Sequence, residues 1–394
     1  MKVLLINHFP LEGSGSGVYT LNIAKELVKQ GNEVRVIVPS NTKDYPRYKN
    51  IKIHPVYFLK DEKIKGQLKF NFPCFTTHPN SVKTFYDLTE KEEELYMEKF
   101  KNAIEKEIKE FKPNVIHSGH IWLLSYLATT FNVPVVITCH GTDLIGYNTS
   151  DRYKRYLEYA TSNCKHIIAI SKDNKELVEK TFPNSKNKLS LITNGYVEDM
   201  FYKEDLNKKE VLKEIGINKN YEKIVMYAGK LTEIKGVDTL LKACKKYEDN
   251  KTATIICGNG ELYDELLKLK DDLKLKNVYF IGNQKQEVLR KLYNIADVTV
   301  VPSRYEAFGL VAVEALACGS YTIVSNVGGL SSIIKDNVGD IFEIDNVDEL
   351  SSKIIDIING TTKYDRDYIA NYAKEEYSNS KYINDLIKIY NKVK

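Results

Sequence analysis

The chain repeats one hydrophobic pattern along most of its length: a short apolar run, a polar or glycine-containing turn, and a longer amphipathic segment. In the first half this pattern predicts strands at Val3–Asn7, Glu33–Val38, Val115–His117, Val135–Thr138 and Ile167–Ile170. Helix-like segments follow them, the first over residues 18–30. Strands that alternate with helices are typical of a parallel, doubly wound sheet, so we expect a Rossmann-like domain here. Residues 41–112, with the helix-like stretch Glu90–Phe111, break the alternation, and we interpret them as an insertion that shapes an acceptor site.

A second alternating series begins after a polar, lysine-rich connection at residues 197–222. Its expected strands are Lys223–Tyr227, Thr252–Cys257, Asn277–Ile281, Asp297–Val301, Tyr321–Val324 and Asp340–Phe342. The two series predict an α/β protein of two doubly wound domains, residues 1–200 and 201–374, that face each other across a cleft. The last segment, residues 375–394, is expected to be a helix that packs back on the first domain.

Length and charge fit this two-domain prediction. A chain of 394 residues is longer than one hydrophobic core normally organises. Lys and Arg number 57 against 53 Asp and Glu, and residues 1–200 hold 28 of the basic and 23 of the acidic side chains. The sequence has no basic tract or RNA-type aromatic motif, which argues against nucleic acid as a partner. An anionic acceptor or an acidic membrane surface stays open.

The six cysteines are scattered and include no C-x-x-C pair, which favours reduced thiols in a cytoplasmic setting and argues against zinc. The first 20 residues contain a strand-like apolar run without the longer apolar core of a signal peptide. No apolar stretch reaches the roughly 18 residues that a membrane-spanning helix needs. We therefore expect a cytoplasmic protein, with peripheral contact at the inner membrane face left open.

The stretch from Pro302 to Gly319 carries the strongest chemical signal. Glu306 stands in the loop after the strand 297–301, and Glu314 lies in the apolar helix expected at 308–317. The start of such a helix presents free N–H groups that suit a phosphate or a sugar hydroxyl. The carboxylates would lie about 12 Å apart along the helix axis, too far to share a proton but suited to two ends of one elongated ligand. The plainer alternative is a first-turn charge and a solvated helix edge.

Two further segments suit phosphates. The loop Gly13-Ser-Gly-Ser-Gly17 allows close approach of backbone N–H groups, but it lacks the third glycine of G-x-G-x-x-G, so a nicotinamide enzyme is disfavoured. Lys230 and Lys235 follow the strand 223–227, just before a helix expected to begin at Gly236. Most lysines are only surface charge, yet two at a strand end can neutralise two phosphates without a metal.

His140 ends the strand 135–138, at the edge of the first sheet where the cleft is expected. A lone histidine is more often structural, but this position favours contact with a ligand. Asp143 either caps the next turn or meets an acceptor. The string Asp365-Arg-Asp367 is interpreted as a helix start because no hydrophobic strand precedes it, and no metal ligand is assigned.

The pattern P-S-x-x-E-x-F-G-L-x-x-x-E-A-x-A-x-G over residues 302–319 resembles the donor-sugar motif of glycosyltransferase family 4, a family of retaining enzymes with the GT-B fold. The similarity extends from Gly15 to Gly329, with Lys230 where the family commonly has arginine and with Ser320-Tyr321 where Gly-x-Pro is commoner. It implies that the second domain holds the donor. It assigns Glu306 to sugar hydroxyls, Glu314 to the ribose, backbone N–H groups of Phe308, Gly309 and Leu310 to the phosphate or sugar, Gly15, Ser16 and Gly17 to the donor diphosphate, Lys230 and Lys235 to the leaving group, and His140 to the transferred sugar.

The resemblance therefore implies a glycosyltransferase that moves a hexose or N-acetylhexosamine to a hydroxyl acceptor with retention, forming an α-glycosidic bond without a metal. The donor would be a UDP-sugar, and the loops at Gly15 and His140 look most like those of members that use UDP-N-acetylglucosamine. The acceptor, a glycan, a lipid-linked sugar or a small molecule, stays open. Two alternatives stay open as well: a hydrolase or epimerase of UDP-sugars with the same fold, and a nucleotide-binding protein without catalysis.

Overall fold

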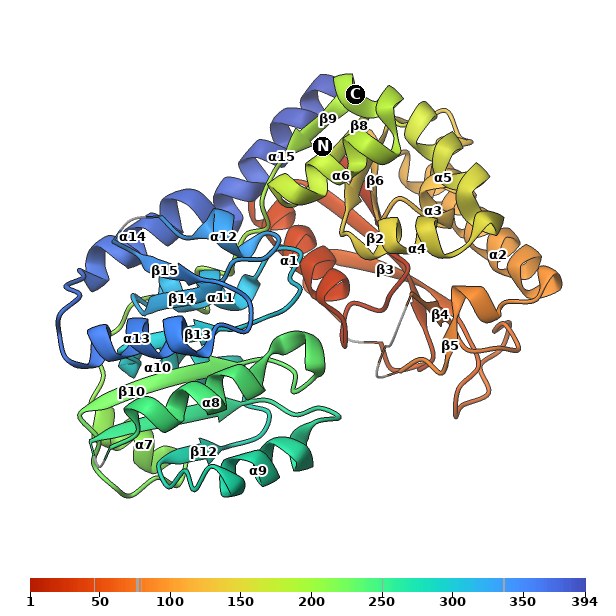
Figure 1. Cartoon of the computed structure of the whole chain (residues 1–394). Coiled ribbons are helices and arrows are strands. Elements are labelled where there is room, and N and C mark those ends of the chain that lie inside the picture. The colour runs from red at the N-terminus through yellow and green to blue at the C-terminus, as the bar shows by residue number, and fades with distance from the viewer. Residues whose placement is uncertain (46, 76–77, 79, 250, 336) are drawn as a thin grey trace. The chain divides into compact units, whose positions relative to one another are not determined.

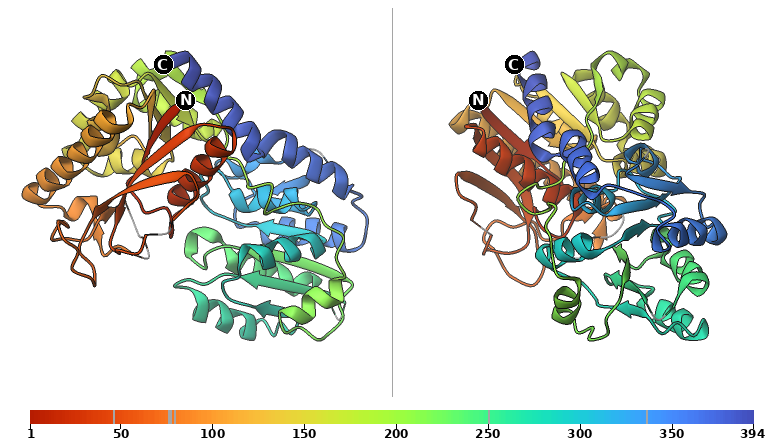
Figure 2. Two further views of the ribbon diagram at one scale, coloured as in Figure 1. Left: turned by 180° about the vertical axis from the view of Figure 1, so that it is seen from behind. Right: turned by 90° about the vertical axis from the view of Figure 1, so that its left-hand side faces the viewer.

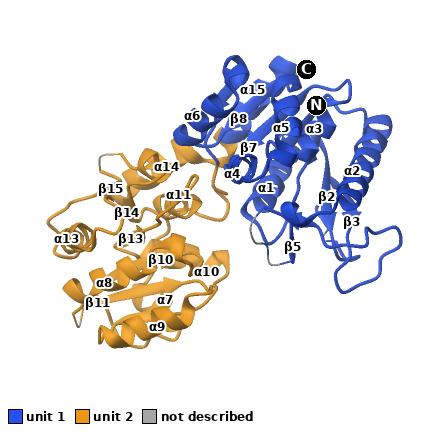
Figure 3. Cartoon of the chain, turned by 45° about the vertical axis from the view of Figure 1, so that its right-hand side comes forward, with its two compact units in different colours: residues 1–194, 382–394 blue, residues 195–381 orange. Residues whose placement is uncertain are grey.

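The computed structural model describes residues 1–45, 47–75, 78, 80–249, 251–335 and 337–394. The chain forms two compact units (Figure 3): residues 1–194 with 382–394 make unit 1, and residues 195–381 make unit 2. The pattern predicts one helix over 375–394, whereas the structure ends α14 (Arg366–Tyr377) and then begins α15 (Asn379–Val393). Among the described residues, no helix combines the length and the apolar character that a membrane-spanning segment needs.

Within the described residues, unit 1 is built on a parallel seven-stranded sheet in the order β3-β2-β1-β6-β7-β8-β9. The strands are β1 (Lys2–Ile6), β2 (Glu33–Ser40), β3 (Ile51–Tyr57), β6 (Val115–Gly119), β7 (Val135–Cys139), β8 (His166–Ala169) and β9 (Leu189–Leu191). The five predicted strands are present. The interpretation of 41–112 as an insertion that breaks the alternation is wrong for β3, which belongs to the sheet. Its edge position leaves the polar residues Lys52 and His54 in the strand, which hides the apolar run. β9 was also missed.

Helices cover both faces of this sheet (Figures 1 and 2). Because side chains alternate along a strand, Val3 and Leu5 of β1 join one core and Leu4 and Ile6 the other. The first core includes α1 and α15, and the second includes α2, α3 and α5. The helices of unit 1 before α15 are α1 (Gly15–Lys29), α2 (Glu90–Phe111), α3 (Leu123–Thr129), α4 (Thr142–Thr149), α5 (Asp151–Asn163) and α6 (Lys172–Thr181), and β4 (Pro73–Cys74) pairs with β5 (Lys83–Thr84).

Unit 2 has, in its described part, a parallel six-stranded sheet in the order β12-β11-β10-β13-β14-β15, and all six predicted strands are present. They are β10 (Lys223–Ala228), β11 (Thr252–Cys257), β12 (Val278–Phe280), β13 (Val298–Val301), β14 (Tyr321–Ser325) and β15 (Gly339–Phe342). The helices are α7 (Lys208–Glu214), α8 (Val237–Tyr247), α9 (Tyr263–Asp272), α10 (Gln286–Ile295), α11 (Leu310–Ala317), α12 (Leu330–Ile333), α13 (Val347–Ile358) and α14. α7 lies in the stretch that the sequence suggests is only a connection.

The chain enters unit 2 beside the place where it leaves. The backbone N–H of Tyr196 donates to the Tyr377 carbonyl at 2.9 Å, and the N–H of Asn379 donates to the Tyr196 carbonyl at 3.0 Å. The Glu198 carboxylate accepts from the backbone N–H groups of Asn379 and Ser380, each at 3.1 Å. A carboxylate at a helix start bonds the first N–H groups and interacts favourably with the positive end of the helix dipole, so Glu198 stabilises the beginning of α15.

Candidate functional site

Two loops of unit 2 meet at the same edge of its sheet. One follows β10 and runs from Gly229 to Gly236, and the other follows β13 and runs from Pro302 to Gly309. β10 and β13 are paired neighbours, although β11 and β12 come between them in sequence. The order in which successive strands are added to the sheet therefore reverses between β10 and β13, and we call this place the winding reversal. In open parallel sheets, ligands bind at such a reversal, outside the carboxyl ends of the strands.

These loops bring Lys235 and Glu306 together, with Nζ 2.6 Å from Oε2. Their side chains stay 27% and 22% exposed, so a ligand can reach both of them. Lys230 is exposed, and its backbone carbonyl accepts a bond from the Tyr227 hydroxyl at 2.8 Å. Within the described ranges, its ammonium group has no ion-pair partner. The structure thus joins two of the expected site residues in one pair and leaves a second cation on the same loop.

Arg304 fixes the loop that carries Glu306. Its Nη1 donates to the Glu233 carbonyl at 2.6 Å, Nη2 donates to both Asp238 carboxylate oxygens at 2.9 and 3.0 Å, and Nε donates to Asp345 at 3.0 Å. Fork-shaped bonding of this kind defines geometry better than a single contact, so three segments at the sheet edge are held in register. Arg304 lies inside the motif, but its role depends on partners far away in sequence.

The start of α11 offers unbonded backbone donors. Gly309, with φ at 105°, is its N-cap, and a Cβ there would lie 2.3 Å from Leu330 Cδ2, so only glycine allows the loop to pack on α12. No group in the described residues accepts a bond from the backbone N–H groups of Phe308, Gly309 or Leu310. The Phe308 side chain is itself buried. Free N–H groups at a helix start suit a phosphate or a hydroxyl oxygen, as the sequence analysis expects.

Glu314 lies on α11 with part of its surface accessible. Burial of the carboxyl raises its pKa to about 8, without a hydrogen bond or cation from the described residues to oppose the shift. Its charge in turn contributes to the raised pKa of the buried Tyr293 hydroxyl, after the effect of burial itself. An accessible carboxyl without a partner can accept hydroxyl donors from a ligand.

The sheet of unit 1 reverses its winding between β1 and β6, and polar side chains gather there as well. His140 follows β7, and its ring centroid lies 4.7 Å from that of His120. A Cβ on Gly119 would lie 3.1 Å from Asn7 Oδ1 and 3.9 Å from His140 Nε2, so the four residues are neighbours. Asn7 Nδ2, His120 Nδ1 and His140 Nε2 are buried and have no hydrogen-bond partner within the described part of the chain.

Burial also sets the charge of this group. It lowers the pKa of His140 to about 4, and it holds the pKa of His120 well below the ordinary value, with a smaller contribution from His140. Both rings are therefore neutral near pH 7 and can each donate or accept one hydrogen bond. His120 also has a φ of 78°, which is uncommon outside glycine. Sequence reasoning missed Asn7 and His120, although both follow strands that meet at the reversal.

Two expectations in unit 1 change. Gly15, Ser16 and Gly17 form the first turn of α1 rather than a loop, and Ser14 is its N-cap. Gly15 is exposed, but a Cβ on Gly17 would lie 2.0 Å from the Pro10 carbonyl oxygen, so Gly17 faces the protein. Asp143 is fully buried and accepts the backbone N–H of Ile121 at 2.8 Å. The N-cap of α4 is Gly141, without a side-chain bond, so Asp143 joins the first turn of α4 to the segment before α3 and has no exposed oxygen for an acceptor.

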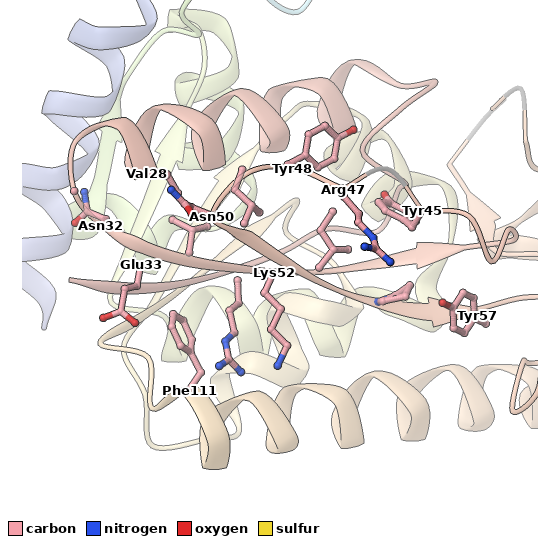
Figure 4. Close-up of a pocket in the computed structure, with 16 residues that line it drawn as sticks. Val28, Asn32, Glu33, Tyr45, Arg47, Tyr48, Asn50, Lys52, Tyr57 and Phe111 are labelled. Carbon is pink, nitrogen blue, oxygen red and sulfur yellow. The ribbon is translucent and has the colours of Figure 1, made fainter.

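The remaining features lie apart from these residues. Asp365 is the N-cap of α14 and accepts from Asp367 N at 2.8 Å, which confirms the helix start. No group of three or more His, Cys, Asp or Glu side chains suited to a metal occurs in the described ranges. A pocket of about 1000 Å³ lies at the edge strand β3, lined in part by Arg35, Lys52 and Phe111, and it contains none of the expected site residues (Figure 4).

Comparison with known proteins agrees with this architecture. Residues 13–199 match the family model described as Glycosyltransferase Family 4, and residues 207–376 match the model described as Glycosyl transferases group 1. An uncharacterized glycosyltransferase of Methanocaldococcus jannaschii is 29% identical, over 99% of this chain and 98% of that protein. N-acetyl-alpha-D-glucosaminyl L-malate synthase of Bacillus anthracis is 25% identical, over 84% of this chain and 80% of that protein. HepE of Anabaena, solved in complex with UDP, superposes with a TM-score of 0.76 at 16% identity and covers 100% of both chains.

Two parallel-sheet units, each with ligand-type groups at its winding reversal, define the class of GT-B proteins, and the superposition on HepE shows this fold. The two family models together account for nearly all of the chain. The chain therefore belongs to the family 4-like glycosyltransferases, and its activity is that of a glycosyltransferase of GT-B type.

Proposed function

We propose that the chain transfers a hexose or N-acetylhexosamine from a UDP-sugar to a hydroxyl acceptor, with retention, forming an α-glycosidic bond without a metal. The observation that carries the proposal is the arrangement at the reversal of unit 2. There, one edge of the sheet holds the Lys235–Glu306 pair, the exposed Lys230 and the unbonded N–H groups from Phe308 to Leu310 in the described residues. Such a set suits a diphosphate next to a sugar.

Each residue has a part in this proposal. Lys230 and Lys235 stabilise the charge that grows on the leaving diphosphate, so they act most strongly in the transition state. Glu306 accepts hydroxyl donors of the transferred sugar, and Glu314 accepts those of the ribose. Neutral His140, from unit 1, is the group proposed to bond the transferred sugar. No side-chain base is assigned to the acceptor, whose proton passes to the leaving phosphate.

N-acetylglucosamine is the sugar we favour. It is the sugar in the name of the malate synthase relative, whose similarity covers 84% of this chain. The UDP in the HepE structure supports the choice of nucleotide. The acceptor is a glycan, a lipid-linked sugar or a small hydroxy compound.

The test is a thermal-shift titration with UDP, GDP and ADP, followed by mass detection of transfer from UDP-N-acetylglucosamine to a panel of hydroxyl acceptors in the presence of EDTA. We expect UDP to raise the melting temperature at micromolar concentration. Glu306→Ala should abolish transfer while the protein still folds. Full turnover by Glu306→Ala, or no response to any nucleotide, would show the assignment to be wrong. Release of free sugar without an acceptor would favour a hydrolase.

A further inference from the structure

The C-terminal helix contributes a tyrosine to a buried network beside His140. The hydroxyl of Tyr382, on α15, bonds the hydroxyl of Tyr19, on α1. Tyr19 Oη also lies 3.3 Å from Thr138 Oγ1, on β7, two residues before His140. Tyr19, Tyr382 and Thr138 are all buried. In such surroundings a hydroxyl that loses its partner is costly, so the bonds define where these groups lie.

The network continues through a neutral histidine. His117 Nε2 lies 2.7 Å from Thr138 Oγ1, and its Nδ1 lies 2.6 Å from the hydroxyl of Tyr390, also on α15. Burial lowers the pKa of His117 to about 3, so the ring carries one N–H and one free acceptor near pH 7. Each ring nitrogen therefore has a matching partner. The helix α15 is thus joined to β6 and β7 through His117 and to α1 through Tyr19.

The ring of Tyr19 forms one wall of the place where His140 lies. Their ring centroids are 4.8 Å apart at an interplanar angle of 86°. The His140 Nε2 atom has no hydrogen-bond partner among the described residues, so packing fixes that edge of the imidazole until a ligand bonds it. His120 also packs against the imidazole ring of His140. An edge-to-face contact is sensitive to the orientation of both rings, so displacement of Tyr19 would turn or loosen His140.

We propose that Tyr382 and Tyr19 are positioning residues for His140, so that the first turn of α15 takes part in orienting the transferred sugar. The inference rests on the proposed function for the role of His140 in transfer, but the packing contact stands without it. Both tyrosines are buried with their hydroxyls bonded in the network, so they are assigned no contact with the reacting atoms. Their effect is to hold the imidazole in one orientation, and misplacement of such a group by about 1 Å can reduce turnover strongly.

The kinetic test compares two single-hydroxyl deletions on the same helix. Tyr382→Phe should lower kcat about tenfold and leave the KM for the donor within about twofold, because binding energy is retained while orientation is lost. Tyr390→Phe is the matched control: it removes a buried hydroxyl of α15 that bonds His117 rather than Tyr19. The control should lower the melting temperature by a similar amount and leave kcat within about twofold of the unmodified protein. Equal kcat values for the two variants would overturn the proposal.

A spectroscopic test does not depend on activity. The ring C–H signals of labelled histidine can be followed by NMR, with the His140 signal assigned from its loss in His140→Gln. We expect that signal to shift or broaden in Tyr382→Phe and in Tyr19→Phe, and to stay in place in Tyr390→Phe. An unchanged His140 signal in Tyr382→Phe would overturn the proposal. If the unmodified protein transfers no sugar and the signal still moves as expected, the proposed function fails and the positioning role stands.

Discussion

Replacement of Glu314 by glutamine should make the protein more stable at alkaline pH and leave it nearly unchanged at acidic pH. The carboxyl has a pKa of about 8 in the folded chain, raised by burial from an ordinary value of 4.5. Between these values the folded chain holds a proton that the unfolded chain has released. The free energy of unfolding of the unmodified protein therefore falls as the pH rises through this window, and the loss is complete above the folded-state pKa.

The size of the effect follows from the same pKa. A rise from 4.5 to about 8 corresponds to at most about 5 kcal/mol. Because Glu314 keeps part of its surface accessible, solvent screens the charge and we expect about 2 kcal/mol. For a domain of the size of unit 2, that is about 4–8 °C in the melting temperature.

Differential scanning calorimetry at about pH 5 and about pH 8.5 measures this difference for the unmodified protein and the Glu314→Gln variant. All other titrating groups are common to the two proteins, so their contributions to the pH dependence of stability cancel in the difference. Glu375→Gln, on the exposed face of α14, is the control for a change of net charge and should melt with the unmodified protein at both pH values. The reasoning is refuted if the gap between the unmodified protein and Glu314→Gln is the same at both pH values.

Three further outcomes are expected. Lys235→Met should weaken UDP binding at least tenfold in calorimetric titration, because a phosphate loses its cation, whereas Lys242→Met, on the more exposed Asp238 pair, should bind UDP normally. Asp143→Ala should destabilise the fold by about 1–3 kcal/mol in urea unfolding, since the buried N–H of Ile121 loses its acceptor, and should leave the KM for the acceptor unchanged. His140→Gln should lower kcat, while the pH–rate profile of the unmodified enzyme should show no histidine titration between about pH 5.5 and 8, because the pKa of His140 is about 4 and the ring is neutral above it. A profile with a step near pH 6.5 that disappears in His140→Gln would contradict the last expectation.

The sequence predicts the fold well because strand and helix periods are local properties. The sequence predicts every strand of unit 2: β10, β11, β13 and β14 are central and buried, and the short edge strands β12 and β15 keep buried apolar residues at Val278 and Phe342. β3 was missed because an edge strand is half solvated, and Lys52 and His54 within it do not follow the buried pattern. The sequence predicts a loop where the first turn of α1 lies because glycine weakens a helix signal, although Ser14 is a good N-cap.

The candidate site was predictable to the extent that it lies within one strand–loop–helix segment. Glu306 and Glu314 fall in such a segment, so the motif that contains both can be recognised in the sequence. The partners that organise the site come from different segments of the chain. Tyr382 meets Tyr19 across 363 residues of sequence, and Arg304 meets Asp345 across 41, with no local pattern to connect them. Pairings of this kind come from the winding order of the sheets, which a single sequence reveals only after the fold is known.

The Lys235–Glu306 ion pair can be exchanged for bonds to the donor in the proposed site. Before a donor binds, each charge is neutralised by the other, so neither is left unpaired in a partly covered position. In the proposed function, a diphosphate attracts Lys235 and competes with the carboxylate for it. Glu306 is then free to accept bonds from sugar hydroxyls at the same moment. Because Arg304 fixes the loop of Glu306 through Asp238, the carboxylate can change partners without moving its backbone, and one binding event prepares both the leaving group and the sugar for transfer.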